Sequence, residues 1–238
     1  MLVATGTVSQ GLQPVARRIF EGLSASYDRV LQVATLMQDR YWKAWLLKTA
    51  AVGEGERVLD VGCGTGVLEQ RLPAAAGPLV VGLDLTEEML RLAQRKGIPA
   101  LGSLCLGDAE RLPFRDGSFD VLLSCYVVKY CDPEVLASEA ARVLRPGGRL
   151  VLYDFSSPRG YYAPFLALYV YGALRAFGAV LRAVDARSAF TYEALPSVIR
   201  ARRWDESFRH ALGSAGFSDL GSRRLSGGAA TGFWATRS

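Results

Sequence analysis

The sequence predicts an α/β protein with a doubly wound, mostly parallel, seven-stranded Rossmann-like sheet, an antiparallel terminal strand and a helical cap or lid. Three observations predict this class. Short apolar runs typical of buried strands alternate with helical segments between residues 57 and 155. A glycine-rich turn follows the first run, and two further strand-like runs close the chain. At 238 residues, half of them hydrophobic, the chain is long enough to bury one such core.

The segment before the sheet is predicted to be helical. Between residues 15 and 50, apolar side chains from Ile19 to Trp42 recur at helical spacing and indicate two helices. After the glycine-rich turn, Val67–Leu72 is expected to open a further helix that Pro73 cuts short.

The strands are the short apolar runs bounded by turn residues. They are Arg57–Val61, Leu79–Leu83, Ala100–Leu106, Phe119–Cys125, Arg149–Phe155, Phe217–Leu225 and Gly232–Thr236, with the last two expected to pair antiparallel.

Capping and breaking residues predict the helices between these strands. Thr86 is placed to cap a helix that Gly97 ends. Another helix starts at Asp132-Pro133-Glu134, runs to about Leu144 and is stopped by Pro146-Gly147-Gly148. The last helix, Asp205–Ala215, is closed by Gly216.

The composition excludes several classes of function. The four cysteines show no metal-ligand spacing, and His210 is the single histidine, so we expect no metal site and no Ser-His-Asp triad. The net charge of +5 is mostly dispersed and no recognition motif accompanies it, so nucleic acid is not an expected partner. Residues 1–13 lack the layout of a secretory signal.

The glycine-rich turn is the central motif. It reads Asp60-Val61-Gly62-Cys63-Gly64-Thr65-Gly66, and alternate glycines let a ligand approach the backbone at a helix start. A dinucleotide fingerprint would place glycine where Val67 stands, so the turn suits a ribose and a methionine tail better than a pyrophosphate.

Acidic residues follow the next two strands. Asp84, with Leu85 after it, can hold both ribose hydroxyls of an adenosine, a reading that fits NAD equally well. Asp108-Ala109 follows the third strand, where the carboxylate can accept a hydrogen bond from an adenine amino group. That placement favours S-adenosylmethionine, although a turn residue is the plainer interpretation of Asp108.

Further stretches carry recognisable motifs. Those in the core are Gly107–Phe114, Gly117–Asp120 and Arg142–Leu150; the flanking ones are Phe20–Asp28, Arg40–Lys43, Asp154–Pro158 and Tyr192–Ile199. These stretches resemble the class I S-adenosylmethionine-dependent methyltransferases, and most closely the ubiquinone and menaquinone C-methyltransferases among them. The resemblance implies a methyltransferase that acts on a prenylated quinol ring.

The resemblance also implies that Thr65, Asp84, Asp108, Ala109 and Ser124 bind the cofactor. The glycine-rich turn and the residue after Asp84 complete the expected cofactor site with Asp60, Gly62, Gly64, Gly66 and Leu85. The chain departs from the family after Ser124, where the family's Arg-Asn pair is replaced by Val128-Lys129, and near Tyr27-Asp28, where Val30 and Leu31 stand in place of an asparagine. The first departure bears on the acceptor rather than on the cofactor.

Methylation of a ring carbon in a quinol requires either that a phenolic proton is removed or that the resulting phenolate anion is stabilised. The candidate catalytic residues are Tyr27, Lys129 and Asp154, and His210 is a less favoured candidate. Lys129 can hold a developing phenolate by its charge. The plainer interpretations are a solvated loop residue for Lys129 and a core aromatic for Tyr27.

The chain is expected to comprise four parts. They are an N-terminal helical cap at 1–50, the cofactor-binding core at 51–157, an apolar and basic lid insertion at 158–204, and a C-terminal helix and strand pair at 205–238 that completes the sheet.

The lid carries Tyr161–Leu174, fourteen residues without a charge, which is too short for the about 20 residues that cross a bilayer. It is either a buried helix or a lid that admits an isoprenoid tail at the membrane surface. Its basic flanks, Arg159, Arg175, Arg182 and Arg200–Arg203, favour the lid.

Three hypotheses follow. The first is a quinol C-methyltransferase in the cytoplasm with a peripheral contact at the inner face of the membrane. The second is a methyltransferase of the same class that acts on another lipid or small molecule, as Val128-Lys129 suggests. The third is a non-catalytic cofactor-binding partner in a lipid-synthesis complex, against which the intact glycine turn argues.

Overall fold

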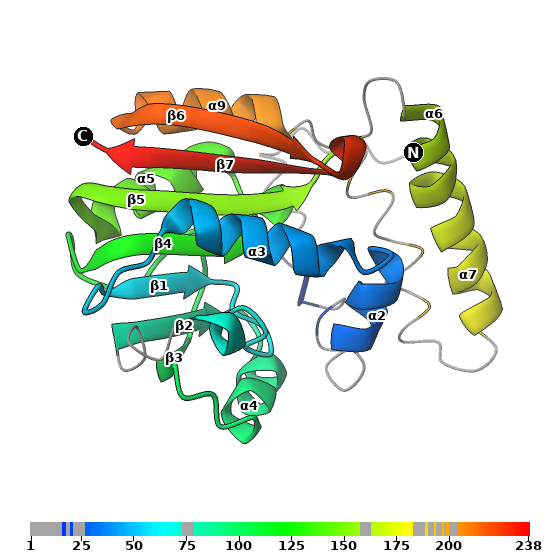
Figure 1. The fold of residues 1–238 in the computed structure, drawn as a ribbon, viewed down its shortest axis with the longest axis horizontal. Helices are drawn as coiled ribbons and strands as arrows, with labels where there is room; N and C mark the ends of the chain where they lie inside the picture. Colours follow the sequence, from blue (N-terminus) through cyan, green and yellow to red (C-terminus); the bar gives the residue numbers. More distant parts are fainter. Residues whose placement is uncertain are drawn as a thin grey trace.

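The computed structural model describes residues 16–17, 20, 27–72, 79–157, 163–182, 189, 193, 197, 199 and 204–238. Its centre is a seven-stranded sheet with the order β3-β2-β1-β4-β5-β7-β6 (Figure 1). The strands are β1 (Val58–Val61), β2 (Val80–Asp84), β3 (Leu101–Leu106), β4 (Phe119–Cys125), β5 (Leu144–Phe155), β6 (Phe217–Leu225) and β7 (Ala230–Arg237). Strands β1 to β5 pair in parallel, and β7 pairs antiparallel with both β5 and β6. The predicted fold class is confirmed.

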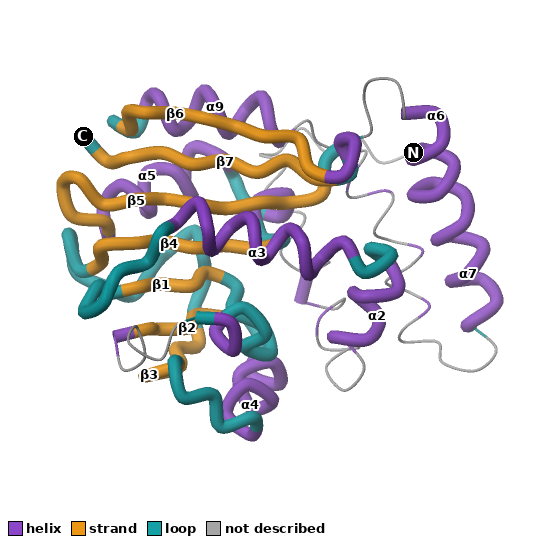
Figure 2. The backbone as a smooth tube through the Cα atoms, in the orientation of Figure 1, coloured by secondary structure: helices purple, strands orange, loops and turns teal. Residues whose placement is uncertain are grey.

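Helices cover both faces of the sheet, as a doubly wound fold requires (Figure 2). They are α2 (Tyr27–Ala34), α3 (Gln38–Ala50), α4 (Glu87–Arg95), α5 (Pro133–Val143), α6 (Ala163–Ala167), α7 (Leu174–Leu181) and α9 (Trp204–Ser214). On one face α5 and α9 pack together over a cluster that includes Leu136, Phe208 and Leu122. On the other, α3 packs through Trp42 and Leu46.

Helix α3 is fixed on the sheet by its two tryptophans. A Cβ atom on Gly232 of β7 would lie 2.1 Å from the Trp45 ring, so glycine is needed there for the indole to approach the backbone. The Trp42 indole N–H donates to Ser226 Oγ at 2.8 Å. With α3 held in this way, α2 lies at the edge of the sheet where β1, β2 and β4 end (Figure 1).

Three local predictions need correction. Val67–Leu72 does not open an α-helix: only a 3-10 turn, Glu69–Arg71, forms there. Thr86 begins α4 in position, but its hydroxyl donates to Asp84 Oδ1 at 2.9 Å and does not cap the helix. Strand β5 starts five residues earlier than predicted, at Leu144 rather than Arg149.

The early start of β5 has a physical reason. The register with β4 shifts between Phe119 and Val121, which makes the Pro146-Gly147-Gly148 segment a bulge inside the strand rather than a loop before it. A Cβ atom on Gly148 would lie 2.8 Å from the Arg145 carbonyl oxygen, so the bulge requires glycine. Helix α5 ends one residue before the predicted limit, with Asp132 accepting from the backbone N–H groups of Glu134 and Val135.

The predicted lid is only partly within the described residues. A helical stretch runs from α6 through a π-helical segment, Leu168–Ala173, into α7 and lies apart from the sheet (Figure 1). The Tyr169 hydroxyl donates to the carbonyl oxygens of Val33 (3.3 Å) and Ala34 (3.5 Å), which joins this stretch to the end of α2. Arg159, Tyr161 and Arg200–Arg203 lie outside the described residues.

Candidate functional site

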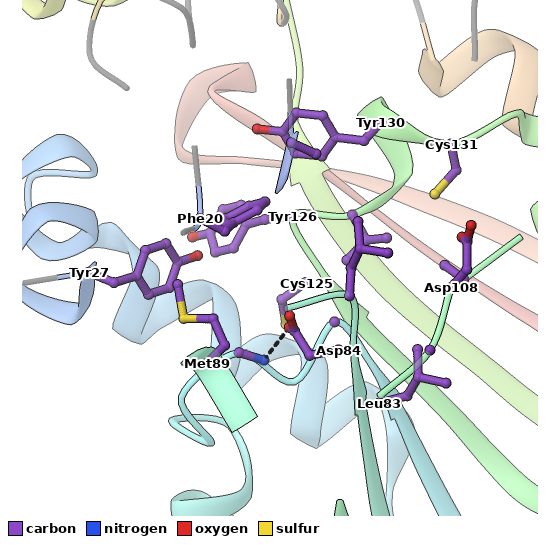
Figure 3. A pocket seen from close by; sticks show the side chains of 17 residues that line it. Phe20, Tyr27, Leu83, Asp84, Met89, Asp108, Cys125, Tyr126, Tyr130 and Cys131 are labelled. Atoms are coloured by element: carbon purple, nitrogen blue, oxygen red, sulfur yellow. Dashed lines mark hydrogen bonds between the residues drawn. The ribbon is translucent and has the colours of Figure 1, made fainter. Parts of the chain in front are cut away.

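A partly open cavity lies at the carboxyl ends of the parallel strands, with about 630 Å³ of space that includes solvent at its mouth. This is the edge at which open α/β sheets bind ligands, next to the point where the strand order reverses between β1 and β4. Figure 3 shows Phe20 and Tyr27 at one end of the cavity, Asp84 at its centre and Asp108 with Cys131 at the other end. A ligand that fills it must therefore be elongated.

The glycine-rich turn forms the floor between β1 and the cavity. The backbone N–H groups of Gly62 and Cys63 both donate to the Leu83 carbonyl oxygen, at 2.7 and 3.0 Å. Gly62, Gly64 and Gly66 all have positive φ angles, which favour glycine. No atom lies within 4 Å of where a Cβ on Gly64 would be, so this position leaves open space above the backbone for a ligand.

Gly66 serves a different purpose. A Cβ atom there would lie 2.2 Å from Ile98 Cδ1 and 3.5 Å from Ala93 Cβ, so the glycine permits close packing against the end of α4. Gly66 does not line either cavity of the site. Its part in cofactor binding therefore stays a prediction, and its contacts are those of a packing residue.

Asp84, at the end of β2, is held rigidly at the centre of the cavity. Its Oδ2 accepts from Gly64 N at 2.9 Å, and its Oδ1 accepts from the backbone N–H and the hydroxyl of Thr86, both at 2.9 Å. Burial raises the pKa of Asp84, and these hydrogen bonds act in the opposite direction. The carboxylate still lines the cavity, beside Leu85, and has remaining lone pairs for ligand hydroxyls.

The far end of the cavity is formed by the loop after β3. Gly107, Asp108 and Ala109 line it, and Gly107 N donates to the Asp84 carbonyl oxygen at 2.9 Å, which holds the two acidic positions side by side. Asp108 Oδ1 accepts from Glu110 N at 2.9 Å. The structure thus brings Asp84 and Asp108 to one cavity, as their positions after neighbouring strands predict.

Aromatic side chains form the near end, and sequence reasoning identified only one of them. Phe20 packs edge-on against Tyr27 and Tyr130, with ring centroids 5.8 Å apart in each pair. Tyr126 completes the wall, has a φ of +68° and donates from its hydroxyl to Asp39 Oδ1 at 2.8 Å. Tyr126 and Tyr130 follow β4, and residues that follow a parallel strand often line a ligand site. Their position in the sequence could therefore have identified them.

Tyr27 lies where the first cavity meets a second one. Burial, followed by the negative charge of Asp39, raises the pKa of Tyr27 well above its usual value. Its hydroxyl therefore stays protonated near neutral pH and can donate a hydrogen bond to an oxygen of a bound ring. It is the one predicted catalytic residue that lines a cavity.

Lys129 and Asp154 form a buried ion pair behind the aromatic wall. Lys129 Nζ lies 2.8 Å from Asp154 Oδ1, and Lys129 N donates to Asp154 Oδ2 at 3.0 Å. Both side chains are at most 2% exposed, and neither residue lines the two cavities. Lys129 Nζ also donates to the Tyr126 carbonyl oxygen, so the pair fixes the turn that carries Tyr126 and Tyr130. Lys129 is thus not a solvated loop residue.

The second cavity, of about 470 Å³, continues from the first past the glycine-rich turn. Its lining is more polar than that of the first cavity and includes Asp60, Thr65, Asp28 and Lys43. Thr65 donates from its hydroxyl to Asp28 Oδ1 at 2.7 Å, and Lys96 Nζ donates to both Asp28 and Thr65. The sequence predicts Asp60 and Thr65 as site residues. It does not predict Lys43, which belongs to the flanking Arg40–Lys43 stretch.

The remaining predicted residues lie away from the cavities. The Ser124 hydroxyl donates to the Val61 carbonyl oxygen at 2.7 Å and links β4 to β1, with the side chain almost wholly buried. His210 is exposed on α9. Across the described residues, no group of three His, Cys, Asp or Glu side chains could hold a metal ion.

These features fit a nucleoside that carries an amino-acid tail. Asp84 offers acceptors for ribose hydroxyls, and the open space above Gly64 admits a ligand at the backbone. Asp60 Oδ1 is buried without a hydrogen-bond donor among the described residues, at the polar end where a charged tail would lie.

Comparison with known proteins gives a family and a set of relatives. Residues 8–237 match the model of the ubiE/COQ5 methyltransferase family. A demethylmenaquinone methyltransferase from Tropheryma whipplei is 35% identical over 217 residues, covering 90% of this chain and 87% of the relative. One from Mycobacterium tuberculosis is 35% identical over 211 residues, covering 88% and 87%.

Solved structures share the fold at low sequence identity. A complex of the Haloferax volcanii Trm112 methyltransferase activator with a putative methyltransferase matches with a TM-score of 0.62 and 20% identity, over 91% of this chain and 96% of that one. An S-adenosylmethionine-dependent methyltransferase from Mesorhizobium loti matches with a TM-score of 0.58 and 18% identity, over 82% and 98%.

Proposed function

The chain belongs to the ubiE/COQ5 methyltransferase family, and from this premise we propose that it methylates a ring carbon of a demethylated prenyl naphthoquinol. Family membership makes the chain an S-adenosylmethionine-dependent enzyme rather than a non-catalytic partner. The naphthoquinol is favoured over a benzoquinol because the similar relatives from Tropheryma and Mycobacterium carry the name demethylmenaquinone methyltransferase.

The observation that carries the proposal is the continuity of the two cavities along the glycine-rich turn. Asp108 and Ala109 would hold the adenine end, Asp84 the ribose, and Asp60 with Thr65 the amino-acid tail. When bound, S-adenosylmethionine supplies an activated methyl group on its sulfonium. The protein's task is then to align an acceptor for in-line displacement and to keep water out.

The aromatic wall suits the ring of the acceptor. Phe20, Tyr126 and Tyr130 offer apolar ring faces and edges, and Tyr27 adds a protonated hydroxyl that can hold a quinol oxygen. Lys129 and Asp154 act behind this wall as positioning residues, since they fix the turn that carries the two tyrosines.

A contact with the membrane surface would let a prenylated acceptor reach the site. Exposed apolar side chains gather where α2 meets the lid helix: Val33, Leu36, Met37, Phe165 and Leu168 are between 48% and 71% exposed. The hydrogen bonds from Tyr169 to the end of α2 bring these two segments together. Of the helices described, none is long and apolar enough to span a bilayer, so the contact we propose is peripheral.

Vesicle binding tests the membrane contact. The double variant Phe165→Ser with Leu168→Ser should lose most of its cosedimentation with anionic vesicles, because it removes the two most exposed apolar side chains of the surface. Val135→Ser is the matched control, since Val135 is an exposed apolar residue on α5. Equal vesicle binding by the wild type and the double variant would contradict the contact.

A panel of acceptors tests the substrate class. Purified protein and S-adenosylmethionine are incubated with demethylated prenyl naphthoquinols, demethylated prenyl benzoquinols and unprenylated phenols, and methylated products are measured. We expect turnover on the naphthoquinols. Turnover on another lipid alone would favour a different acceptor, which the Val128-Lys129 segment first suggested.

A further inference from the structure

Two buried carboxyl groups that flank the glycine-rich turn in the sequence, Asp60 before it and Glu69 after it, interact with each other. Asp60 lies in the middle of β1 and is 2% exposed, and Glu69 lies in the 3-10 turn that follows the glycines and is 0% exposed. Asp60 Oδ1 and both carboxyl oxygens of Glu69 have no hydrogen-bond donor among the described residues. Buried polar atoms are rarely left in this state, so each needs an explanation.

A shared proton explains the pair. Two carboxylates cannot hydrogen-bond unless one of them is protonated, and their charges repel when both are ionised. Burial raises the pKa of Asp60 well above its usual value, and the negative charge of Glu69 raises it further. Burial likewise raises the pKa of Glu69, to about 7. The pair therefore changes its charge near neutral pH as one unit.

The charged groups around the pair are already engaged elsewhere. Lys43 on α3 favours the ionised pair by its charge, but its Nζ is bonded to Asp39. Lys96, after α4, acts on Glu69 in the same direction, and its Nζ is bonded to Asp28 and Thr65. Asp84 on β2 adds a negative charge that disfavours ionisation of Asp60. None of these cations is bonded to the pair.

Asp60 also connects the pair to the cofactor site. It lines the second cavity, which shares Tyr27, Gly62 and Gly64 with the first. A ligand whose ribose binds Asp84 and whose tail follows the glycine-rich turn brings its amino group toward Asp60. An ammonium supplies the donors and the positive charge that the ionised pair lacks.

We propose that Glu69 is a positioning residue that shares a proton with Asp60 in the free enzyme and releases it when the cofactor's ammonium binds beside Asp60. The proposal rests on the proposed function, since it takes S-adenosylmethionine as the ligand. One proton passes from the carboxyl pair to solvent, and the ammonium keeps its own protons. Cofactor affinity should then depend on pH through this pair.

The test is the pH dependence of binding, measured by titration calorimetry with two ligands. S-adenosylhomocysteine carries the amino-acid tail, whereas 5′-methylthioadenosine has the same nucleoside without it. For the wild type, affinity for S-adenosylhomocysteine should fall about tenfold per pH unit below about pH 7, because a proton must be displaced. Calorimetry in buffers of different ionisation enthalpy should show proton release near pH 7, and methylthioadenosine binding should show neither effect.

Variants assign the effect to Glu69. Glu69→Gln should shift the pH dependence of S-adenosylhomocysteine affinity to lower pH and reduce proton release near pH 7, because Asp60 loses the neighbouring negative charge that adds to the effect of its burial. Glu69→Asp should shift the profile back toward that of the wild type. Glu87→Gln, the same change at an exposed glutamate on α4, should behave as the wild type.

Several outcomes overturn the proposal while leaving the proposed function intact. They are a flat wild-type profile, the same pH dependence for both ligands, or a Glu69→Gln profile that is not shifted from that of the wild type. Because the wild-type comparison of two ligands stands alone, the test does not depend on the folding of a variant. Failure to bind S-adenosylhomocysteine at any pH would instead count against the proposed function.

Discussion

At the scale of single residues, the site depends on side chains whose orientation is fixed before a ligand arrives. Asp84 accepts three hydrogen bonds from Gly64 and Thr86. These bonds hold its carboxylate against the cavity, so little rotamer freedom remains to be lost on binding. The orientation of Tyr126 is fixed in the same way, because its hydroxyl donates a hydrogen bond to Asp39.

Replacing Asp84 tests its role directly. Asp84→Ala should weaken S-adenosylhomocysteine binding about 100-fold, about 3 kcal/mol, because two charge-assisted hydrogen bonds to ribose hydroxyls are lost. Isothermal titration measures the change. Asp116→Ala, at an acid with a 79% exposed side chain, is the control. An affinity within twofold of the wild type would show that Asp84 does not hold the ribose.

The buried pair of Lys129 and Asp154 gives a second prediction. Lys129→Met should destabilise the protein by about 3–5 kcal/mol, because it leaves the buried Asp154 carboxyl without its cationic partner. The double variant Lys129→Met with Asp154→Leu should recover much of this loss. Urea unfolding measures both. A Lys129→Met variant as stable as the wild type would contradict this prediction.

Sequence reasoning predicted the residues of the cavity that belong to short local motifs. Asp84 and Asp108 could be placed because each directly follows a parallel strand. The pairing of Lys129 with Asp154 could not be predicted, because 25 residues separate them and only the packing of β4 beside β5 brings them together. The proximity of Glu69 to Asp60 was not predicted for a related reason. Glu69 lies in a 3-10 turn, whereas the sequence predicted an α-helix there.

At the scale of elements, two glycines of the turn that follows β1 meet different structural requirements. Gly64 leaves space for a ligand, whereas Gly66 leaves space for Ile98. Both have positive φ angles, so an alanine at either position carries a similar backbone strain. The two sites therefore form a matched pair in which only the neighbouring contact differs.

Alanine at each glycine should separate binding from stability. Gly64→Ala should cost about 1 kcal/mol of unfolding free energy from backbone strain but reduce cofactor affinity at least about tenfold. Gly66→Ala should cost about 3 kcal/mol, because its Cβ also meets Ile98. Thermal unfolding and titration with S-adenosylhomocysteine measure the two effects. Equal losses of stability in both variants would contradict this division.

Asp120 ties three neighbouring strand segments at the opposite edge of the sheet. Its Oδ2 accepts from Arg57 N at 2.8 Å, just before β1, and its Oδ1 accepts from Arg145 in β5. Burial raises the pKa of Asp120, but the hydrogen bonds from Arg145 and Arg57 outweigh it and lower the pKa to about 2. A carboxyl with a lowered folded-state pKa stabilises the fold above its unfolded pKa of about 4.

The acid sensitivity of this link gives a further prediction. Asp120→Asn should cost about 1–2 kcal/mol of unfolding free energy at pH 7. The difference from the wild type should shrink as the pH falls from about 4 to about 2, because the wild-type carboxyl becomes protonated over that range. Urea unfolding at several pH values measures it. A constant difference down to pH 2 would rule out the ionised link.

Elements with strong local signals were predicted well, and those set by tertiary contacts were not. The N-cap of α5 at Asp132 and the span of β4 are confirmed to the residue. The start of β5 was misplaced because a Pro-Gly-Gly segment is typical of a loop, and only pairing with β4 makes it a bulge. The apolar lid sequence predicted a helix but not its π-helical segment.

At the scale of the whole molecule, the cap and the sheet build one site from two directions. Helix α2 carries Tyr27 to the cavity from the start of the chain, while the strand ends supply the glycine-rich turn and the acids (Figure 3). The lid helix contacts the end of α2 through Tyr169, so the exposed apolar surface and the aromatic end of the cavity share one element. This arrangement would place the membrane contact that we propose next to the position that we propose for the acceptor ring.

The most direct test of the central claim is the fate of a labelled methyl group. Purified protein is incubated with S-adenosylmethionine carrying a ¹³C-methyl group and with a demethylated prenyl naphthoquinol, and the product is examined by NMR. We predict that the label appears as a methyl group on a ring carbon. Label on a ring oxygen, or no transfer from a cofactor that is shown to bind, would contradict the account.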